Sequence, residues 1–189
     1  MNPNPSIEGF LAERERAREE CARLDELVSI YKKEMPDIVP KWDTSPASIS
    51  FNDISEDIKA SGLSIYVCKM EELWGGLYEP SIYEANTIWK KVHDSAKIAR
   101  VIDAWSKSEP LSPLFLVKHL NFDQGLVADG KHRLTVSRAI HASEVPFMVE
   151  ATKAAWIFRA FPTALCIHQA QPSAPLDVHA SATLRRGCG

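Results

Sequence analysis

The longest regular pattern of apolar and polar positions covers residues 6–35 and predicts one long helix. Pro36 cannot continue a helix and ends it. The charges alternate in sign over residues 13–20, which suits a solvated face, but the helix could also dock on a partner or on a second copy of the chain. The apolar stripe repeats every seven residues and is widened by three neighbours: Phe10, Ala17, Leu24 and Tyr31, with Cys21, Leu27 and Val28.

Residues 36–50 contain three prolines and several Ser and Thr side chains, and we expect a connector there. Beyond it, the pattern changes between the strand period of about two and the helix period of about 3.6 residues. The expected elements are a short helix capped by Asn52 or Asp53 and closed at Gly62, a strand over 63–68, a helix that starts at Asp94 or Ser95 and ends before Pro110, a hairpin of strands 114–117 and 126–128, a helix over 132–141, a strand over 145–149 and a helix over 152–161.

Regular periodicity ends after Pro162, where the chain becomes polar and contains further prolines. We therefore expect an N-terminal helical arm and linker over residues 1–50, one folded domain over 51–162 and a flexible C-terminal tail over 163–189. The order of the elements predicts an α+β fold class, with a small mixed sheet and flanking helices.

The composition is that of an ordinary globular protein, with 45% hydrophobic and 25% charged residues. A formal net charge of −3 provides no general attraction to nucleic acid, so such binding would need a local basic patch. The first residues lack the basic and apolar segments of an export signal, and no run of about 18 apolar residues occurs. We expect a cytoplasmic protein that does not enter a membrane.

Most cysteines, histidines and tryptophans show no spacing that indicates a special role. The four cysteines form no CxxC pair, so we expect ordinary thiols and no metal held by cysteine. The five histidines other than His132 are expected to be surface or core residues. Four tryptophans lie among apolar neighbours and are expected to pack rather than to stack on bases: Trp74, Trp89, Trp105 and Trp156.

The segment 126–134 has the clearest chemical signature, because a short strand breaks at Gly130 and a helix follows at once. Backbone N–H groups at a helix start have no partner within the helix and lie at the positive end of its dipole, so they suit phosphate oxygens. Lys131, His132 and Arg133 add three potential cations, and Gly130 leaves room for a ligand. The same pattern is also typical of an ordinary exposed basic surface. Asp129 fits a phosphate site only if it caps the helix, orients His132 or helps to hold a metal ion.

Three segments resemble domains of the ParB/sulfiredoxin-like superfamily. Asp129-Gly130-Lys131-His132-Arg133, followed by a short helix and the strand 145–149, is similar to an Asp-Gly-x-His-Arg signature. Residues 94–103 resemble the sulfiredoxin helix that carries a nucleotide-binding lysine, here Lys97. Residues 65–73, with Tyr78-Glu79-Pro80 behind them, resemble the opening strand and loop. Together these segments imply the ParB/sulfiredoxin fold for the middle of the chain.

The resemblance implies a nucleotide cleft. We expect ATP or CTP as the ligand, Mg²⁺ is inferred from the chemistry of phosphate transfer alone, and no dedicated protein site for a metal ion is expected. A kinase activity like that of the free serine kinases would need a base, and the loop carboxylates Glu72 and Glu79 are candidates, although both are also typical of solvated loops. The candidate catalytic residues are His132, Asp129 and Glu79. The expected ligand contacts are Lys97, Arg100, Gly130, Lys131, His132 and Arg133.

At some positions the sequence differs from sulfiredoxin or ParB proteins, and these differences limit which functions the resemblance implies. Lys131 stands where sulfiredoxin has its cysteine, so no thiolate is available and sulfinic-acid reduction is excluded. Arg100 and Ala104 stand where sulfiredoxin has hydroxyl residues. The segment after Glu150 is too short and too interrupted by prolines for the helix-turn-helix region of DNA-partitioning ParB proteins.

The leading hypothesis is therefore a nucleotide-binding domain that hydrolyses or transfers the terminal phosphate of ATP or CTP. The alternative is a non-catalytic interaction module, in which the long N-terminal helix binds a partner and the basic turn reads an anionic ligand or a nucleic-acid backbone. A ParB-like nuclease is a weaker option, because the chain lacks a basic face.

Overall fold

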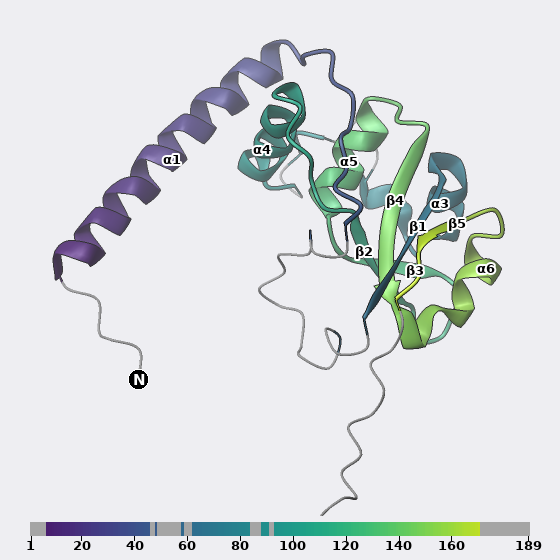
Figure 1. The fold of residues 1–189 in the computed structure, drawn as a ribbon. Helices are drawn as coiled ribbons and strands as arrows, with labels where there is room; N and C mark the ends of the chain where they lie inside the picture. The colour runs from purple at the N-terminus through teal and green to yellow at the C-terminus, as the bar shows by residue number, and fades with distance from the viewer. Residues whose placement is uncertain are drawn as a thin grey trace, which may run out of the picture.

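The computed structural model describes residues 7–45, 48, 58, 62–83, 88–90 and 93–170 (Figure 1). Its centre is a five-stranded mixed sheet in the order β3-β2-β4-β1-β5. The strands are β1 (Leu63–Lys69), β2 (Leu114–Lys118), β3 (Gly125–Asp129), β4 (Glu144–Glu150) and β5 (Leu165–His168). The helices are α1 (Ile7–Lys33), α3 (Met70–Gly76), η2 (Pro80–Tyr83), α4 (Ser95–Ser106), α5 (Lys131–Ala139), η4 (Ala151–Trp156) and α6 (Ile157–Ala160).

Both antiparallel and parallel pairing hold the sheet together. Strand β1 runs antiparallel to β4 and to β5, and β2 and β3 form an antiparallel hairpin. The pair β2 and β4 is parallel, and the chain makes the required crossover through β3 and α5. This arrangement confirms the predicted α+β class with a small mixed sheet.

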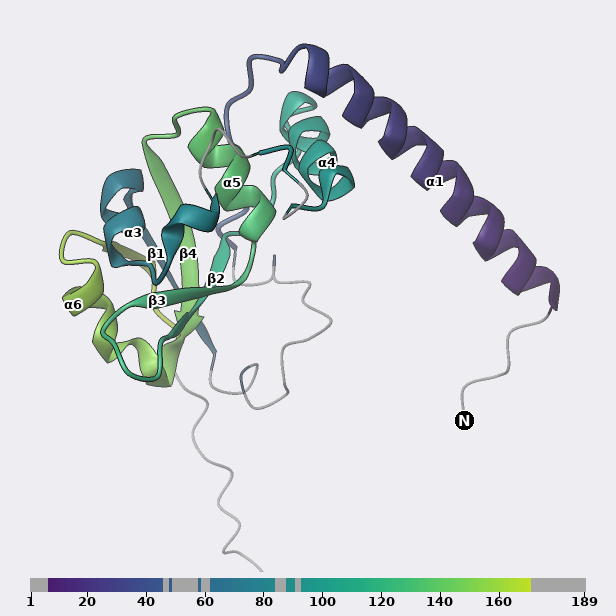
Figure 2. The ribbon, with the colours of Figure 1, turned by 180° about the vertical axis from the view of Figure 1, so that it is seen from behind.

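The main core lies between one face of the sheet and the helices α3, α5 and α6 (Figures 1 and 2). Phe147 and Leu116 from the sheet, Leu73 from α3 and Leu134 from α5 are at most 1% exposed in this cluster. A second cluster joins α4 to α5 through Ile98, Ile102 and Val136 and also contains Tyr31 of α1. The second cluster holds α4 against α5, the helix that begins at the predicted functional turn.

Helix α1 confirms the long helix expected at the N-terminus. Side chains 7–19 are all exposed, and this half of the helix extends away from the domain in both views (Figures 1 and 2). Leu24 is the buried residue of α1, and the second half of the helix packs on α4. Helical periodicity alone therefore predicted the element but not which half of it is docked.

The predicted strands and the helices α4 and α5 are confirmed within a few residues. The helix expected over 152–161 is instead split into the 3₁₀ helix η4 and the short α-helix α6, and the backbone of Lys153 within η4 is non-helical. Helices α3 and η2 were not expected. The short helix predicted after Asn52 lies almost entirely outside the described residues.

The folded domain continues past the boundary predicted at residue 162. Residues 165–168 form β5 and pair with β1 through an irregular register. Three of the four side chains of β5 are exposed, so its sequence carries little of the apolar signal that marks a buried strand. Residues 171–189, which include most of the predicted tail, lie outside the described part of the chain.

Candidate anion-binding cleft

The turn between β3 and α5 requires glycine. Gly130 has a φ of 91°, in the left-handed region that residues with a Cβ rarely adopt. A Cβ at this position would lie 2.8 Å from Leu114 Cδ2 and 3.1 Å from Arg133 Nη2. The chain can therefore change from strand to helix here without an intervening loop, and the start of α5 lies directly beyond the end of β3.

The first turn of α5 has open backbone donors. Gly130 is the N-cap residue, and no side chain caps the helix. The earliest helical hydrogen bond runs from the Leu134 N–H to the Gly130 carbonyl, so helix geometry leaves the N–H groups of Lys131, His132 and Arg133 without intrahelical acceptors. These groups, with the positive end of the helix dipole, suit an anionic ligand.

Helix α4 begins differently, because its N-terminus is already occupied. The Asp94 carboxylate accepts hydrogen bonds from the Ala96 and Lys97 N–H groups at 3.0 and 3.2 Å. An anion therefore has open backbone donors at the start of α5, whereas α4 contributes side chains. The two helices therefore differ at their starts, although both carry a lysine in the first turn: Lys97 in α4 and Lys131 in α5.

A cleft of about 430 Å³ lies between α4 and the start of α5. This volume is within the range of small-molecule sites in proteins. Lys97 and Arg133, which the sequence predicted to meet around one ligand, both line it. The complete lining is Lys97, Arg100, Val101, Leu111, Ala128, Asp129, Gly130, Lys131, His132 and Arg133.

Lys97 and Lys131 are the cations of the cleft best placed to meet a ligand. Both side chains are exposed, and neither makes an ion pair within the part of the chain that the structure describes. They come from different helices. A phosphate group between them would also meet the open N–H groups of α5, so charge and directed hydrogen bonds would act on the same ligand.

Arg133 differs from the prediction that its guanidinium is available to grip a phosphate. Its Nη2 donates to Asp129 Oδ2 at 2.7 Å and to the Pro113 carbonyl at 3.4 Å. Its side chain is 17% exposed, and its buried Nε has no hydrogen-bond partner among the described residues. Asp129 therefore neither caps α5 nor orients His132, and it instead neutralises Arg133 at the wall of the cleft.

Arg100 also has a partner. Its Nη2 lies 3.2 Å from Oε1 of Glu20, a residue of α1 that the sequence did not connect with the site. Both side chains remain partly exposed. The cleft therefore contains two unpaired lysines and two arginines that are paired with carboxylates.

His132 is half-buried at the cleft wall, and its surroundings favour the neutral imidazole. Burial lowers the pKa of His132, and the positive charge of Lys97 lowers it further, against the opposing effect of Asp94. The His93 ring lies 6.5 Å away, centroid to centroid. The neutral ring can accept a proton at neutral pH, whereas it supplies less positive charge than the sequence reading assumed.

The structure does not bring Glu79 to the cleft. The Tyr78 N–H donates to the Gly125 carbonyl at 2.9 Å, which fixes this loop at the start of β3, whereas Gly130 follows the end of that strand. The Tyr78 hydroxyl donates to Glu79, and this hydrogen bond raises the pKa of Tyr78. Glu79 is therefore not among the residues that line this cleft.

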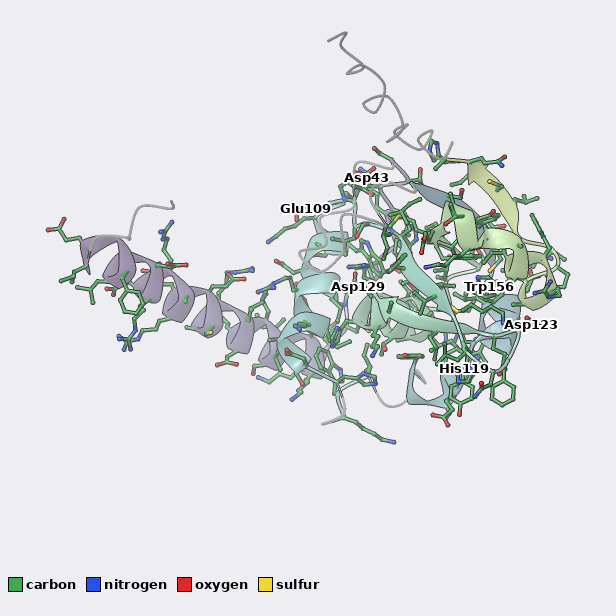
Figure 3. All side chains as sticks on the ribbon, turned by 90° about the horizontal axis from the view of Figure 1, so that it is seen from below. Asp43, Glu109, His119, Asp123, Asp129 and Trp156 are labelled. Atoms are coloured by element: carbon green, nitrogen blue, oxygen red, sulfur yellow. The ribbon has the colours of Figure 1, made fainter. Side chains whose placement is uncertain are left out.

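Glu72 is also engaged elsewhere, because Thr163 donates to it through both its N–H group and its hydroxyl. Figure 3 shows Asp129 on the side of the domain next to α4, and His119 and Asp123 toward the opposite end. The lining of the cleft includes one carboxylate, Asp129. A kinase-type base would therefore have to come from His132 or from outside the described residues.

A larger hollow of about 550 Å³ lies between the connector 37–44 and the start of β4, but its lining contains no lysine or arginine. It includes the carboxylates of Asp37 and Glu144 and would repel a phosphate. Charge thus favours the smaller cleft as the anion site.

Among the described residues, no group of three or more His, Cys, Asp or Glu side chains is arranged to hold a metal ion. None of the described helices is long and apolar enough to cross a membrane.

The sequence reading missed the apolar wall of the cleft. Val101 lies one helical turn after Lys97 and so shares its face of α4, and Leu111 lies in the connector that follows the helix. The spacing of Lys97 and Val101 could have indicated this. Nothing in the sequence pairs Glu20 with Arg100, because 80 residues separate them.

No protein-family model and no curated protein sequence matches the chain. Among solved structures, the fold is similar to the crystal structure of oncogenic suppression activity protein, which is described as a plasmid fertility inhibition factor. The two chains are 14% identical, the similarity covers 79% of this chain and 88% of that one, and the TM-score is 0.43. A likeness of this size assigns no role to any residue.

Proposed function

We propose that this chain is a nucleotide-binding protein of the ParB/sulfiredoxin type, and that its cleft holds the phosphates of ATP or CTP. One observation carries the proposal. Two lysines without an ion pair among the described residues, Lys97 from α4 and Lys131 from α5, line one cleft at the start of α5, the helix start of the pair that lacks a capping side chain. Open N–H donors and positive side chains around one cleft suit a phosphate group.

The remaining lining suits the rest of a nucleotide. Val101 and Leu111 provide apolar surface at the cleft, against which a ribose or a base can pack. A Mg²⁺ ion would enter with the nucleotide and would be held mainly by phosphate oxygens, since Asp129 is the one carboxylate in the lining and is already paired with Arg133.

Hydrolysis of the terminal phosphate is the proposed activity, with His132 as the base. In this reaction a water oxygen forms a bond to the terminal phosphorus, the bond to the bridging oxygen breaks, and the neutral imidazole accepts a proton from the water. The lowered pKa of His132 supports this role. Transfer to a protein or metabolite hydroxyl has less support, because Glu72 and Glu79 point elsewhere.

The second candidate is a binding module without turnover. The pairing of Arg133 with Asp129 favours it, because the arginine in the first turn of α5 is then not free to stabilise the charge of a transition state. Both candidate functions require that the cleft binds the same nucleotide, but only the hydrolase is expected to release phosphate.

Thermal shift assays with ATP, CTP, ADP and inorganic pyrophosphate, each with and without Mg²⁺, test the binding step. We expect the melting temperature to rise with ligand concentration, because a ligand that binds only the folded state stabilises it. Lys97→Ala should remove most of the shift. Lys33→Ala changes the same residue type on the exposed end of α1 and should leave the shift unchanged.

A phosphate-release assay on the same proteins decides between the two candidates. Release that His132→Asn abolishes, while binding persists, supports hydrolysis. Saturable binding without release supports the module. If no nucleotide and no pyrophosphate shifts the melting temperature, the cleft is not a phosphate site.

A further inference from the structure

We propose that α1 restrains the cleft: its Glu20 competes with the bound anion for Arg100, so anion binding and full docking of α1 oppose each other. This inference rests on the proposed anion site and adds a regulatory role for the N-terminal helix. It predicts that a single contact on α1 sets the affinity of a site built by α4 and α5.

Arg100 connects the two features directly. It lies three residues after Lys97 on α4, and both side chains line the cleft. Its Nη2 also donates to Glu20 Oε1 at 3.2 Å, across to α1. The same guanidinium is therefore within reach of the ligand site and of the helical arm.

The contact between Arg100 and Glu20 belongs to a network of ion pairs between α1 and α4, and its 3.2 Å is the longest hydrogen-bond distance among those that join Arg100, Glu20, Arg23 and Asp103. Glu20 is held more closely by Arg23, whose Nε and Nη2 donate to its two oxygens at 2.8 and 3.1 Å. Arg23 in turn donates to Asp103 Oδ2 at 2.9 Å, which anchors α1 on α4 independently of Arg100. Arg100 can therefore leave Glu20 while the inner anchor of α1 remains in place.

A phosphate is a stronger acceptor for Arg100 than Glu20 is. Arg100 donates one hydrogen bond to Glu20, and the accepting oxygen is shared with Arg23. A phosphate oxygen pair can accept two parallel hydrogen bonds from a guanidinium and carries more negative charge. Arg100 should therefore turn toward a bound polyphosphate and release Glu20.

Glu20 should also oppose the ligand through its charge. The hydrogen bond from Arg23 is the largest influence on Glu20 and keeps its pKa below the ordinary value, so the carboxylate is ionised at neutral pH. An ionised carboxylate next to Arg100 repels a polyanion in the neighbouring cleft. Because coupling between two binding events is reciprocal, whatever releases Glu20 must raise the affinity for the anion.

The opposite sign would follow if Glu20 held Arg100 in the correct place for the ligand. Removing the carboxylate would then weaken binding. The direction of the change in affinity therefore separates competition from positioning.

The test is isothermal titration calorimetry with pyrophosphate on the full chain and on Glu20→Gln. We expect Glu20→Gln to bind about five- to tenfold more tightly, at the lower end of typical coupling between sites. Glu19→Gln removes the same charge one residue away, on an exposed side chain with no ion pair to α4 among the described residues, and should change the affinity less than twofold.

Arg100→Ala supplies the second half of a double-mutant cycle. It should weaken pyrophosphate binding, and in its background Glu20→Gln should lose most of its effect. Weaker or unchanged binding by Glu20→Gln overturns the proposal, as does an effect that persists without Arg100. If the unmodified chain binds no pyrophosphate, the anion site itself fails, and this result is distinct from binding that ignores Glu20.

Hydrogen–deuterium exchange provides a readout that affinity alone does not. Most of the stability of a helix in a protein comes from its tertiary packing, so loosening of α1 should speed exchange of its amides. Saturating pyrophosphate should accelerate exchange over residues 10–22 in the unmodified chain and leave it unchanged in Arg100→Ala. Equal or slower exchange in the unmodified chain contradicts the competition.

Discussion

Asp129 and Arg133 form an ion pair across the first turn of α5, with 2.7 Å between Oδ2 and Nη2. Arg133 is the residue of the sequence motif best suited to bind phosphate, but in this ion pair its guanidinium is bound to Asp129 at the wall of the cleft. The pair leaves Lys97 and Lys131 as the unpaired cations of the lining within the described structure. The acidic residue of the motif thus moderates the positive charge of the site.

Asp129→Asn should strengthen pyrophosphate binding several-fold in the absence of metal. The substitution removes a negative charge from the cleft and frees the Arg133 guanidinium, which can then bind two phosphate oxygens. Calorimetric titration measures the change. Asp123→Asn is the control, since Asp123 is also paired with an arginine, Arg159, but lies outside the cleft lining.

If Asp129 instead holds a metal ion for the ligand, the result reverses. Asp129→Asn would then weaken ATP binding in the presence of Mg²⁺ while leaving metal-free pyrophosphate binding intact or improved. Loss of binding under both conditions would contradict both readings and would indicate that the ion pair is needed to shape the turn.

His132 should make anion binding stronger as the pH falls. Burial holds the pKa of the free His132 below 6.5, and a bound anion stabilises the imidazolium and raises that pKa. Binding is therefore coupled to proton uptake between the two values. NMR titration of the His132 ring with and without pyrophosphate measures both, and an unchanged pKa on binding would place the anion away from this ring.

The same shift has a consequence for the stability of the free protein. Because the folded-state pKa is depressed, the contribution of His132 to stability is present above about pH 6.5 and is lost as the pH falls toward the folded value. His132→Asn should therefore flatten the fall in melting temperature between about pH 7 and pH 5. A fall of equal steepness in both proteins would assign the acid sensitivity to other groups.

Gly130→Ala should destabilise the fold by about 1–3 kcal/mol, because a Cβ at a φ of 91° is strained and meets Leu114 at 2.8 Å. It should also weaken anion binding by displacing the start of α5. Gly75→Ala on α3 is the matched control, since a Cβ there meets no atom within 4 Å. Chemical denaturation of the two variants measures the difference, and equal stabilities would contradict the strain at Gly130.

Asp103→Asn should loosen α1. The Asp103 side chain is 11% exposed, and its carboxylate accepts hydrogen bonds from Arg23, Lys107 and the Tyr31 hydroxyl. We expect a loss of about 2 kcal/mol, as for a partly buried hydrogen bond to a charged group, and faster amide exchange in α1. Asp25→Asn, on the exposed face of α1, should show neither change, and slow exchange in both variants would contradict the anchor.

The docking of α1 should also weaken in acid. Burial tends to raise the pKa of Asp103, but hydrogen bonds from Lys107 and Arg23 outweigh it, so the folded-state pKa is lowered. The stabilisation is then present above the unfolded pKa of about 3.9 and is lost as the pH falls below it. Exchange measured between pH 5 and pH 3 should show α1 opening first.

Much of the fold could be predicted because its elements carry their own signals. The spacing of Ile98, Ile102 and Trp105 marks α4, and the alternation and β-branched residues of β1 and β4 mark the central strands. The turn at Gly130 could also be predicted, because residues other than glycine rarely adopt a φ like that of Gly130. The prediction that Lys97 lies near this turn came from a family resemblance and not from periodicity.

The unpredicted features all depend on contacts between distant segments. The exposed side chains of β5 hide it among loop residues, and only pairing with β1 makes it a strand. The positions of Glu79 and Glu20 follow from the hydrogen bond at Gly125 and from the docking of α1, which no local pattern encodes. Side-chain charge alone also could not reveal that Arg133 faces Asp129 and not the ligand.

The most direct measurement is a crystal structure of the full chain soaked with a non-hydrolysable ATP or CTP analogue. We expect a phosphate within hydrogen-bond distance of the Lys131 N–H group and of Lys97 Nζ, with Arg133 still paired with Asp129 or released from it toward the ligand. A nucleotide bound elsewhere, with the Lys97 and Lys131 side chains in contact only with solvent, would contradict the proposed cleft.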